Sequence, residues 1–366
     1  MIPFNDLKPL HNLLADELNA AALRALNSGW YILGPELAAF EAEFAAYHGV
    51  GHAVGVANGT DAIELALRAG GVGPGDEVIT VSHTAVPTVC AVEHAGAAPV
   101  LVEINPDTYT MDPDAARAAI TPRTKALLPV HLYGHSADMD ALGALAAQHG
   151  LLLIEDCAQA HGARWKGQLV GTFGHMAAFS FYPTKNLGAA GDGGAVITDD
   201  AQLAERLRLL RNYGQSVRYH NVTRGVNSRL DEVQAAILRV KLAHLDAHNA
   251  RRRALAAIYD RDLAGVTLPR PVGDVEHVYH LYVVRHPQRD RFMEALKARS
   301  VGTLIHYPIP VHRQEAYADL GYGPGSLPLT EQIAQEIVSL PLYIGLTDSD
   351  VETVAAAARH SLVETV

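Results

Sequence analysis

Cysteine is scarce in this chain of 366 residues, which contains only Cys90 and Cys157. The two are far apart in the sequence and form no C-x-x-C pair. The pattern therefore gives no support to a zinc ribbon or to the disulfide framework of a small secreted domain. We expect both cysteines to be small, buried, apolar residues.

Basic residues are also in deficit: 29 Lys and Arg stand against 40 Asp and Glu, for a formal net charge of -11. This balance opposes a general role in binding nucleic acid or an anionic membrane surface. No apolar run is long enough to cross a bilayer, and the opening MIPFNDLKPLHN lacks the basic start and apolar block of a signal peptide. We expect a soluble, cytoplasmic protein with no nucleic-acid or membrane partner, in which local donors hold any anionic ligand.

Apolar residues, in contrast, make up 49% of the chain, enough for a large core. At this length we expect one large domain and a smaller one. Leu37, Phe40, Phe44 and Tyr47 recur at spacings of three and four, which predicts a helix. Short β-rich segments then alternate with helix-like segments, which predicts an α/β domain with a largely parallel sheet: HAVGVA (52–57), EVITV (77–81), PVLVEI (99–104), KALLPV (125–130) and LLLIED (151–156).

The second half of the chain has a different pattern. After residue 200 it becomes helical, with a long segment from about 229 to 253. A second small α/β section follows, with a strand in YHLYVV (279–284) and a helix near 290–298. We place a domain boundary between 245 and 250, so that residues 1–247, with an N-terminal segment 1–35, form the large domain and residues 248–366 the small one.

Ligands of such sheets bind where strands end and loops lead into helices. Asp156 ends one expected strand, and a carboxylate there needs a cationic or hydrogen-bonding partner. A helix N-cap is the alternative role for this residue. The turn Asn58-Gly59 precedes a helix that starts near Thr60, and such a start favours phosphate binding, although many α/β proteins contain this turn for structural reasons alone.

Lys185 lies in SFYPTKNLGAAGDGGA, where the expected strand MAAFSF delivers first Ser180 and then the lysine. Its glycines follow the lysine instead of preceding it, which excludes a Walker A phosphate loop. Asp156, Lys185 and the Gly59-Thr60 turn are together what pyridoxal phosphate (PLP) requires. A lysine forms the Schiff base, an acidic group pairs with the pyridinium nitrogen, and a helix start with hydroxyls holds the phosphate.

With these residues the chain resembles the DegT/DnrJ/EryC1/StrS family of sugar aminotransferases, PLP enzymes of fold type I. The resemblance implies a large domain with a mostly parallel seven-stranded sheet flanked by helices, and a smaller C-terminal α/β domain. The matching stretches cover nearly the whole chain in family order: WYILGPELAAFEAEFA, GVANGTDAIELAL, GPGDEVITVSHTAVPT, ALLPVHLYGHSADMDAL, IEDCAQAHGA, SFYPTKNLGAAGDGGA, GVNSRLDEVQAAIL and SLPLYIGLTDSDV.

The resemblance also implies roles for individual residues. Lys185 and Asp156 are the catalytic pair, and Gln159 lies near the phenolic oxygen of the cofactor. His83 is expected to place its ring over the cofactor, the alternative being a strand-end histidine bonded to backbone. The remaining cofactor contacts, all to phosphate, are Gly59, Thr60, Ser180 and, from the neighbouring subunit, Asn227.

That last contact implies a homodimer with composite sites. From the residues alone Asn227 reads as a helix N-cap, and both roles can coexist. The implied reaction takes an amino group from an amino acid, by family habit glutamate, to form pyridoxamine phosphate. The nitrogen then passes to a keto carbon of a nucleotide-linked sugar, in amino-sugar biosynthesis. Lys185 is the expected proton carrier, because desolvation and nearby positive charge lower the pKa of an amine.

Substrate contacts are hypotheses at this stage. Arginines gather in one segment, and some of them could neutralise a diphosphate. Arg218 and Arg224 are our candidates, whereas Arg206 and Arg208 fit a solvated helix face. Tyr307 and His312, in HYPIPVHRQEAY, belong to a family segment near the mouth of the site and are candidates for contact with donor or sugar. The rest of the basic cluster comprises Arg211, His220 and Arg229.

The aminated carbon is left open by the sequence. In GAAGDGGA, Asp192 stands where many C4-acting relatives resemble GEGG, and SHTAVPT looks like the C3-acting branch. The resemblance therefore favours a dTDP-3-keto-6-deoxyhexose. A 4-keto sugar is the first alternative and a cyclitol the second, and neither the nucleotide base nor the stereochemistry is specified.

Other classes of protein fit less well. A dehydratase branch of the family has histidine in place of Lys185, and an oxidoreductase of nucleotide sugars needs a G-x-G-x-x-G turn that is missing. A PLP-binding regulatory or sensory protein remains an alternative, opposed by the intact catalytic set. His131 and His135 have the spacing of a helical metal pair, but they follow a strand, so we expect no metal site.

Overall fold

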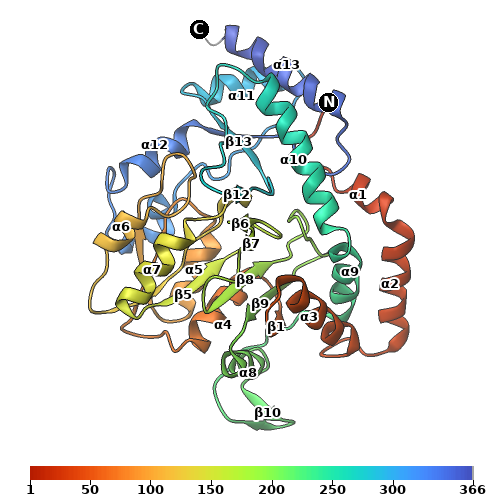
Figure 1. Cartoon of the computed structure of the whole chain (residues 1–366), viewed down its shortest axis with the longest axis vertical. Coiled ribbons are helices and arrows are strands. Elements are labelled where there is room, and N and C mark those ends of the chain that lie inside the picture. Colours follow the sequence, from red (N-terminus) through yellow and green to blue (C-terminus); the bar gives the residue numbers. More distant parts are fainter. Residues whose placement is uncertain (365–366) are drawn as a thin grey trace.

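A seven-stranded sheet in the order β1-β9-β8-β5-β4-β2-β3 forms the centre of the molecule (Figure 1). The computed structural model describes the backbone of residues 1–364 and the side chains of residues 1–361, so the last two residues of the expected small domain lie outside it. The strands are β1 (His52–Val56), β2 (Glu77–Val81), β3 (Ala98–Val102), β4 (Thr124–Leu127), β5 (Leu152–Asp156), β8 (Met176–Ser180) and β9 (Gly194–Thr198).

Only β9 runs against its neighbours in this sheet. All other neighbouring pairs are parallel, which confirms the expected mostly parallel sheet. Because β1, β8, β5, β4 and β2 share one direction, their carboxyl ends meet at one edge.

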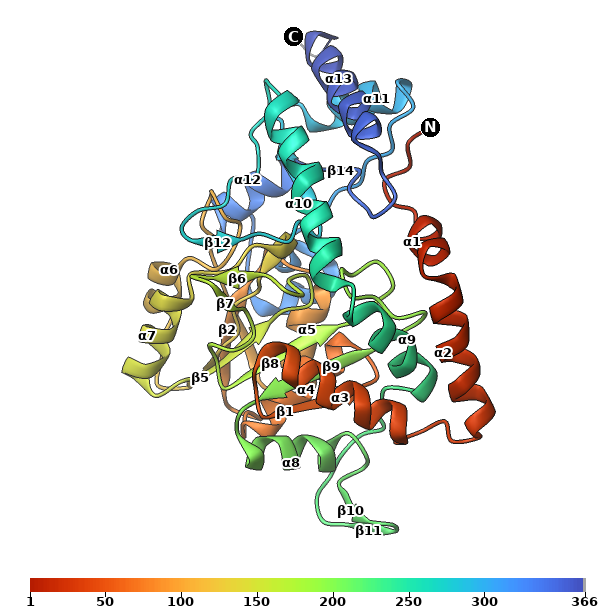
Figure 2. The ribbon, with the colours of Figure 1, turned by 45° about the vertical axis from the view of Figure 1, so that its right-hand side comes forward.

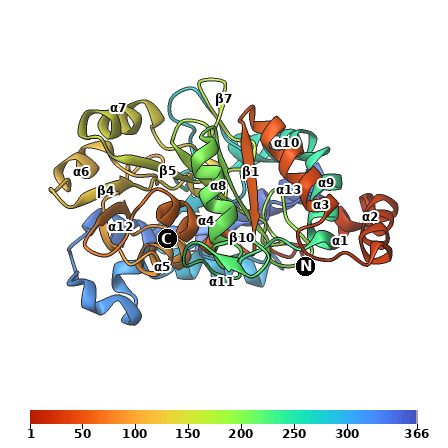
Figure 3. The same cartoon turned by 90° about the horizontal axis from the view of Figure 1, so that it is seen from below.

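Helices cover both faces of the sheet, as the view from below shows (Figure 3). Alternation along β8 illustrates how the sequence produces the layers: Met176 and Ala178 pack with the helices of one face, Ala177 and Phe179 with those of the other. One face carries α4 (Gly59–Ala69), α5 (Val86–His94) and α8 (Ala201–Leu210). The other carries α3 (Pro35–His48), α6 (Pro113–Ala118), α7 (Met139–His149) and α9 (Glu232–Leu242).

A second core lies in the C-terminal part of the chain, where β13 (Tyr282–Arg285) pairs antiparallel with β14 (Ile337–Leu340). Helix α10 (Leu245–Asp262) connects the two cores (Figure 2), since Leu245 packs in the large core and Leu255 and Tyr259 in the second. The expected boundary at residue 247 thus falls inside a helix. The single long helix expected over 229–253 is wrong, because α9 ends at Leu242 and α10 begins at Leu245. Further helices of this part are α11 (Arg289–Ala298), α12 (Pro328–Glu336) and α13 (Asp348–Glu364).

The N-terminal helices α1 (Lys8–Leu13) and α2 (Ala15–Ser28) lie along one side of the molecule, where α2 packs on α9 (Figure 2). The short hairpin β10 (Gln215–Val217) and β11 (His220–Asn221) projects from the opposite end to α13 (Figures 1 and 2). A small three-stranded sheet comprises β6 (Arg164–Trp165), β7 (Gln168–Leu169) and β12 (Val275–Glu276), and 3-10 turns are found at Leu132–Gly134, Val311–Arg313 and Glu315–Leu320. Within residues 1–364, no helix combines the length and the apolarity that a bilayer span requires.

Candidate active site

A cavity of about 360 Å³ opens where the parallel strands end. Loops that follow β1, β2, β4, β5 and β8 supply most of its wall, and the C-terminal part of the chain supplies the rest. Seven of the residues expected from the sequence line it: Gly59, Thr60, Asp156, Gln159, Ser180, Lys185 and Tyr307.

Asp156 ends β5 and is 3% exposed. Its Oδ2 accepts a hydrogen bond from the Thr88 hydroxyl at 2.8 Å, and its Oδ1 accepts one from the Ala158 N–H at 3.1 Å. Burial raises the pKa of this carboxyl, and the hydrogen bonds of Ala158 and Thr88 and the nearby charge of Lys185 oppose that shift. The carboxylate is therefore held in one orientation, but its neighbours do not fully offset the cost of burying its charge. A cationic ring N–H would suit it as a further partner.

Lys185 is half-buried in the loop after β8, where its backbone N–H bonds the carbonyl of Tyr182 at 2.8 Å. The next residue, Asn186, anchors the loop through hydrogen bonds to Asn249 and to the carbonyl of Val278. Burial lowers the pKa of the Lys185 amine to about 8, and the Asp156 carboxylate opposes this shift. An appreciable fraction of the amine is thus neutral, and so nucleophilic, near physiological pH.

The start of α4 forms an anion cradle. Asn58 caps the helix by accepting a hydrogen bond from the Asp61 N–H at 2.9 Å, so the N–H groups of Gly59 and Thr60 have no acceptor within the helix. A Cβ on Gly59 would lie 2.5 Å from the Cβ of Ser180, so only glycine allows the helix start and the end of β8 to approach this closely. Free N–H groups, a helix dipole and two hydroxyls fit a phosphate.

Gln159 has a fixed orientation above this cavity. Its Oε1 accepts the N–H of Tyr133 at 2.7 Å, and its Nε2 donates to the hydroxyl of Tyr307 at 3.0 Å. Burial raises the pKa of Tyr307 to about 12, so the phenol keeps its proton. The lysine, the buried carboxylate, the amide and the phosphate cradle together match the functional groups of PLP.

The two histidines expected at the site lie elsewhere. His83 is fully buried with its Nε2 bonded to the Tyr133 hydroxyl at 2.9 Å, neither lining the cavity nor bonded to backbone, and Ala85 lines the cavity instead. His312 is buried between Ser82, at 2.7 Å, and Glu331, at 3.1 Å, and fixes the turn that contains it. The structure does not bring either ring to the site.

The arginine cluster is dispersed in space. Arg211 is buried against Glu41 and the carbonyl of Gly55, and Arg206 bonds the carbonyl of Ala69. Arg218 and Arg224 are exposed near the projecting hairpin, away from the cavity of their own chain. Asn227 is likewise exposed and does not line this cavity.

Several residues that line the cavity were not predicted from the sequence. Thr88 and Thr84 bond each other, and Thr88 holds Asp156. Their i, i+4 spacing in SHTAVPT is the sequence feature that could have indicated this contact. His280 and His306 come from the C-terminal part of the chain, and no local pattern distinguishes them from core histidines. Tyr182 and Thr184, which also line the cavity, flank Lys185 in the sequence.

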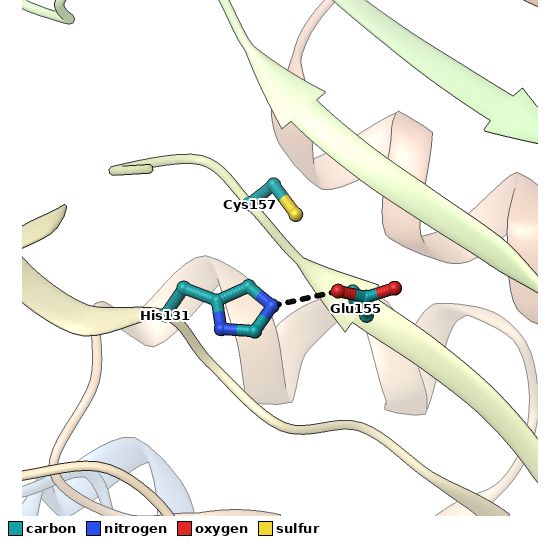
Figure 4. A group of neighbouring side chains, drawn as sticks. All are labelled: His131, Glu155 and Cys157. Atoms are coloured by element: carbon teal, nitrogen blue, oxygen red, sulfur yellow. Dashed lines mark hydrogen bonds and ion pairs between the residues drawn. The ribbon is translucent and has the colours of Figure 1, made fainter. Parts of the chain in front are cut away.

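Beneath the site, His131, Glu155 and Cys157 place potential ligand atoms within 4.8 Å of one another (Figure 4). The carboxylate of Glu155 already accepts four hydrogen bonds, from His131 Nε2 and from the N–H groups of Gly171, Phe173 and Gly174. The other ring nitrogen of His131 accepts from the Ala137 N–H, and burial raises the pKa of the Cys157 thiol well above its usual range. The cluster is a satisfied hydrogen-bond network that supports β5. The second cysteine, Cys90, is half-buried, unlike the buried residue we expected.

Comparison with known proteins decides the family. A sequence model of the DegT/DnrJ/EryC1/StrS aminotransferase family matches residues 12–359. The chain belongs to this family. The resemblance noted from its motifs and the fold expected from them are thereby confirmed.

Relatives within the DegT/DnrJ/EryC1/StrS family are close. The dTDP-3-amino-3,4,6-trideoxy-alpha-D-glucose transaminase of Streptomyces venezuelae is 56% identical over 93% of this chain and 91% of its own length. The erythromycin biosynthesis sensory transduction protein EryC1 of Saccharopolyspora erythraea is 53% identical over 98% of this chain and 99% of its own.

Solved structures of the family agree. S. venezuelae DesV in complex with a ketimine intermediate superposes with a TM-score of 0.97, at 54% identity over 99% of this chain and 98% of that one. NtdA from Bacillus subtilis with bound cofactor PMP gives a TM-score of 0.92, at 32% identity over 99% of this chain and 85% of that one.

Proposed function

We propose that the protein transfers an amino group from an acidic amino acid, glutamate, to the C3 keto carbon of a dTDP-linked 3-keto-6-deoxyhexose, with PLP as cofactor. The convergence of Lys185, Asp156 and the α4 cradle on one cavity is the observation that carries this proposal. PLP, when bound, supplies an electron sink and carries nitrogen between the two half-reactions.

The residues of the chain have separate tasks in this reaction. Asp156 holds the ring nitrogen of the cofactor protonated, and Thr88 and Ala158 fix the direction of its carboxylate. Gly59, Thr60 and Ser180 bind the phosphate of the cofactor, and the side chain of Gln159 lies near its phenolic oxygen. Lys185 holds the cofactor and, once released, moves a proton to and from the carbon that carries nitrogen, a role suited to its pKa of about 8.

Amination at C3 is supported by the name of the S. venezuelae transaminase, which is that of a 3-amino sugar enzyme. Asp192, whose motif favoured the same carbon, lines the cavity. Mass spectrometry of products from dTDP-3-keto and dTDP-4-keto sugars, followed by NMR to place the nitrogen, tests this. Nitrogen at C4 would contradict the proposal and favour the alternative.

A homodimer with composite sites is part of the proposal. Exposed apolar side chains lie on the second half of α2 and in the segment after it, and the projecting hairpin exposes Val217, Tyr219 and Val222. Both regions suit burial against a second copy. In such a dimer Arg218 and Arg224 would reach the nucleotide diphosphate of the neighbouring site, and Asn227 its cofactor phosphate. The exposed apolar side chains of α2 and the segment after it are Leu23, Leu26, Trp30, Tyr31 and Ile32.

The double variant Arg218→Ala/Arg224→Ala tests the diphosphate contact. We expect the KM for the nucleotide sugar to rise at least about tenfold while the KM for glutamate stays constant, because charge-assisted hydrogen bonds to the diphosphate are lost. Arg208→Ala, a change on the surface of α8, is the control. An unchanged KM for the nucleotide sugar would remove these arginines from the proposed site.

The test of the reaction itself starts from the colour of the purified protein with PLP. Borohydride should fix the cofactor on Lys185, as peptide mass spectrometry would show, and glutamate should remove the yellow absorbance. Lys241→Ala is the matched control, because Lys241 is also a partly buried lysine but bonds the carbonyl of Gly188. A spectrum that no amino acid changes would contradict the aminotransferase and favour a regulatory or sensory role, which the name of EryC1 suggests for that relative.

We also assign the protein to the cytoplasm. Neither Cys90 nor Cys157 is in a disulfide, which is compatible with a reducing compartment.

A further inference from the structure

A second cavity of about 340 Å³ adjoins the cofactor cavity. Tyr182, Thr184, His280 and His306 line both, so these four side chains form the boundary between them. The remaining wall of the second cavity is mostly apolar and includes one charged side chain: Phe4, Asn5, Arg252, Leu281, Leu304, Leu340 and Leu342.

Arg252, on α10, is only 7% exposed. Its Nη1 donates to the backbone carbonyls of Tyr279 at 3.1 Å, His280 at 3.5 Å and Leu342 at 3.0 Å. Among the described residues no carboxylate pairs with it, and its Nε and Nη2 have no hydrogen-bond partner. One nitrogen thus fixes the guanidinium, and the Nε–Nη2 edge remains available to a ligand in the cavity.

A buried charge of this kind is costly unless it is compensated. Burial lowers the pKa of Arg252 to about 10, and at neutral pH the group is still protonated because the pH lies well below that value. The free edge of a guanidinium offers two parallel N–H donors, the geometry that a carboxylate accepts. The apolar side chains around it suit the methylene groups of an aliphatic ligand.

No other permanent cation lines either cavity apart from Lys185, among the residues that the structure describes. His280 and His306 are neutral, because burial lowers the pKa of His306 to about 4 and that of His280 well below its usual range. Lys185 is committed to the cofactor and to proton transfer. Within its own chain, Arg252 is therefore the group that remains to recognise an anionic substituent next to the reacting centre.

We propose that the second cavity binds the side chain of the amino donor and that Arg252 binds its distal carboxylate, which makes the enzyme selective for acidic amino acids. This inference rests on the proposed aminotransferase function. The α-carbon of the donor must lie beside Lys185 in the cofactor cavity, and its α-carboxylate, one bond away, must stay there too. The distal carboxylate is farther along the chain and can cross the boundary into the adjoining cavity.

The first test compares glutamate with norvaline, which has the same number of carbons but no distal carboxylate. The readout is the rate at which each removes the absorbance of the PLP-loaded protein. In Arg252→Gln we expect the preference for glutamate over norvaline to fall at least about tenfold. The rate with glutamate should fall, and the rate with norvaline should stay the same. Arg252→Lys should recover part of it, and Arg253→Gln, at the neighbouring position of α10, should keep the preference of the unchanged protein.

A second test leaves Arg252 in place. Leu304 lines the cavity and is 49% exposed, so a polar substitution there is compatible with folding. Leu304→Glu would supply a carboxylate that competes for Arg252 and would weaken the binding of glutamate, whereas Leu304→Gln would not. Calorimetry with glutarate, which cannot react, should show binding to the PLP-loaded unchanged protein and none to Arg252→Gln or Leu304→Glu.

The outcomes separate the two proposals. If no amino acid changes the spectrum of the unchanged protein, the proposed function fails. Suppose that glutamate changes the spectrum of the unchanged protein. If Arg252→Gln then keeps the preference for glutamate over norvaline, or reacts more slowly with both by the same factor, the assignment of Arg252 is wrong. Equal glutarate binding by the Leu304→Glu and Leu304→Gln variants would overturn it as well.

Discussion

The two groups at the centre of the proposed chemistry, Lys185 and Asp156, act on each other's protonation. Burial favours the neutral form of both, so it lowers the pKa of the lysine and raises that of the carboxyl. Their mutual attraction favours the charged forms and limits both shifts. The balance leaves the lysine with a pKa of about 8, a value between that of a surface amine and that of a fully desolvated one.

This balance predicts how the apoprotein captures PLP as pH changes. Only the neutral amine attacks the aldehyde, so the rate of capture should rise as pH increases through about 8. In Asp156→Asn the attraction that raises the lysine pKa is gone, and the midpoint should move to lower pH. Stopped-flow absorbance on cofactor-free protein measures both profiles.

Asp140→Asn, a substitution at an exposed surface carboxylate, should leave the midpoint unchanged. The same Asp156→Asn variant should lose activity by at least about 100-fold, because it no longer stabilises the protonated ring. A midpoint equal in Asp156→Asn and in the unchanged protein would show that the two groups are not coupled.

Residue identity could be predicted from the sequence where a strand end fixes a position. Asp156 and Ser180 end strands whose limits were recognisable, Gly59 and Lys185 follow such strands, and all four line the cavity. The role of His83 stays a prediction: its buried ring bonds the Tyr133 hydroxyl, and no pattern in the stretch after β2 indicates that contact. His280 and His306 depend on how the C-terminal part of the chain packs, which no local pattern encodes.

At the scale of elements, the close approach of α4 to β8 predicts that Gly59→Ala is poorly tolerated. The new Cβ would lie 2.5 Å from the Cβ of Ser180, so the helix start must move away from the strand. We expect a loss of about 1–3 kcal/mol in the free energy of unfolding and a weaker affinity for PLP. Thermal unfolding and PLP titration measure the two effects.

Gly143, inside α7, provides the control for this substitution. A Cβ there meets nothing within 4 Å, so Gly143→Ala should stabilise the protein by about 0.5–1 kcal/mol and leave PLP affinity unchanged. Equal effects of the two substitutions would show that Gly59 is not packed as described.

The Glu155 network beneath β5 gives another prediction. Glu155→Gln replaces one acceptor oxygen with a donor that faces N–H groups, so it should cost at least about 2 kcal/mol of stability. Because the carboxylate is already saturated with hydrogen bonds, added zinc or EDTA should leave the melting temperature of the unchanged protein constant. A zinc-dependent rise in melting temperature that is lost in Glu155→Gln would instead identify a metal site.

Elements with a strong pattern were predictable, and those that depend on tertiary contacts were not. The strands at 52–57, 77–81 and 151–156 match β1, β2 and β5 within a residue. The break between α9 and α10 interrupts a helical pattern without proline or glycine, and it follows from the need of α10 to cross to the second core. The antiparallel strand β9 was not predicted, because its apolar run is short and directly follows a glycine-rich loop.

At the scale of the whole molecule, the distribution of charge supports the dimer. The net charge is -11, yet the hairpin region from Arg218 to Arg224 is exposed and basic. An acidic body with a projecting basic arm places its cations where a second copy can use them for an anionic substrate. Among the residues that the structure describes, no arginine lines the cofactor cavity of a single chain.

Mixing two variants with different defects, assayed at a nucleotide-sugar concentration below the KM of the unchanged protein, tests the composite site. One carries Lys185→Ala, and the other carries alanine at Arg218, Arg224 and Asn227. In a dimer that contains one of each, one site has both defects and the other has neither. Random exchange of equal amounts puts half of the dimers in this mixed form, so activity should recover to about a quarter of that of the unchanged protein.

Light scattering establishes the oligomer, and each parent alone is the control. Activity that stays at the mean of the parents, although subunits exchange, would show that each chain builds its site from its own residues.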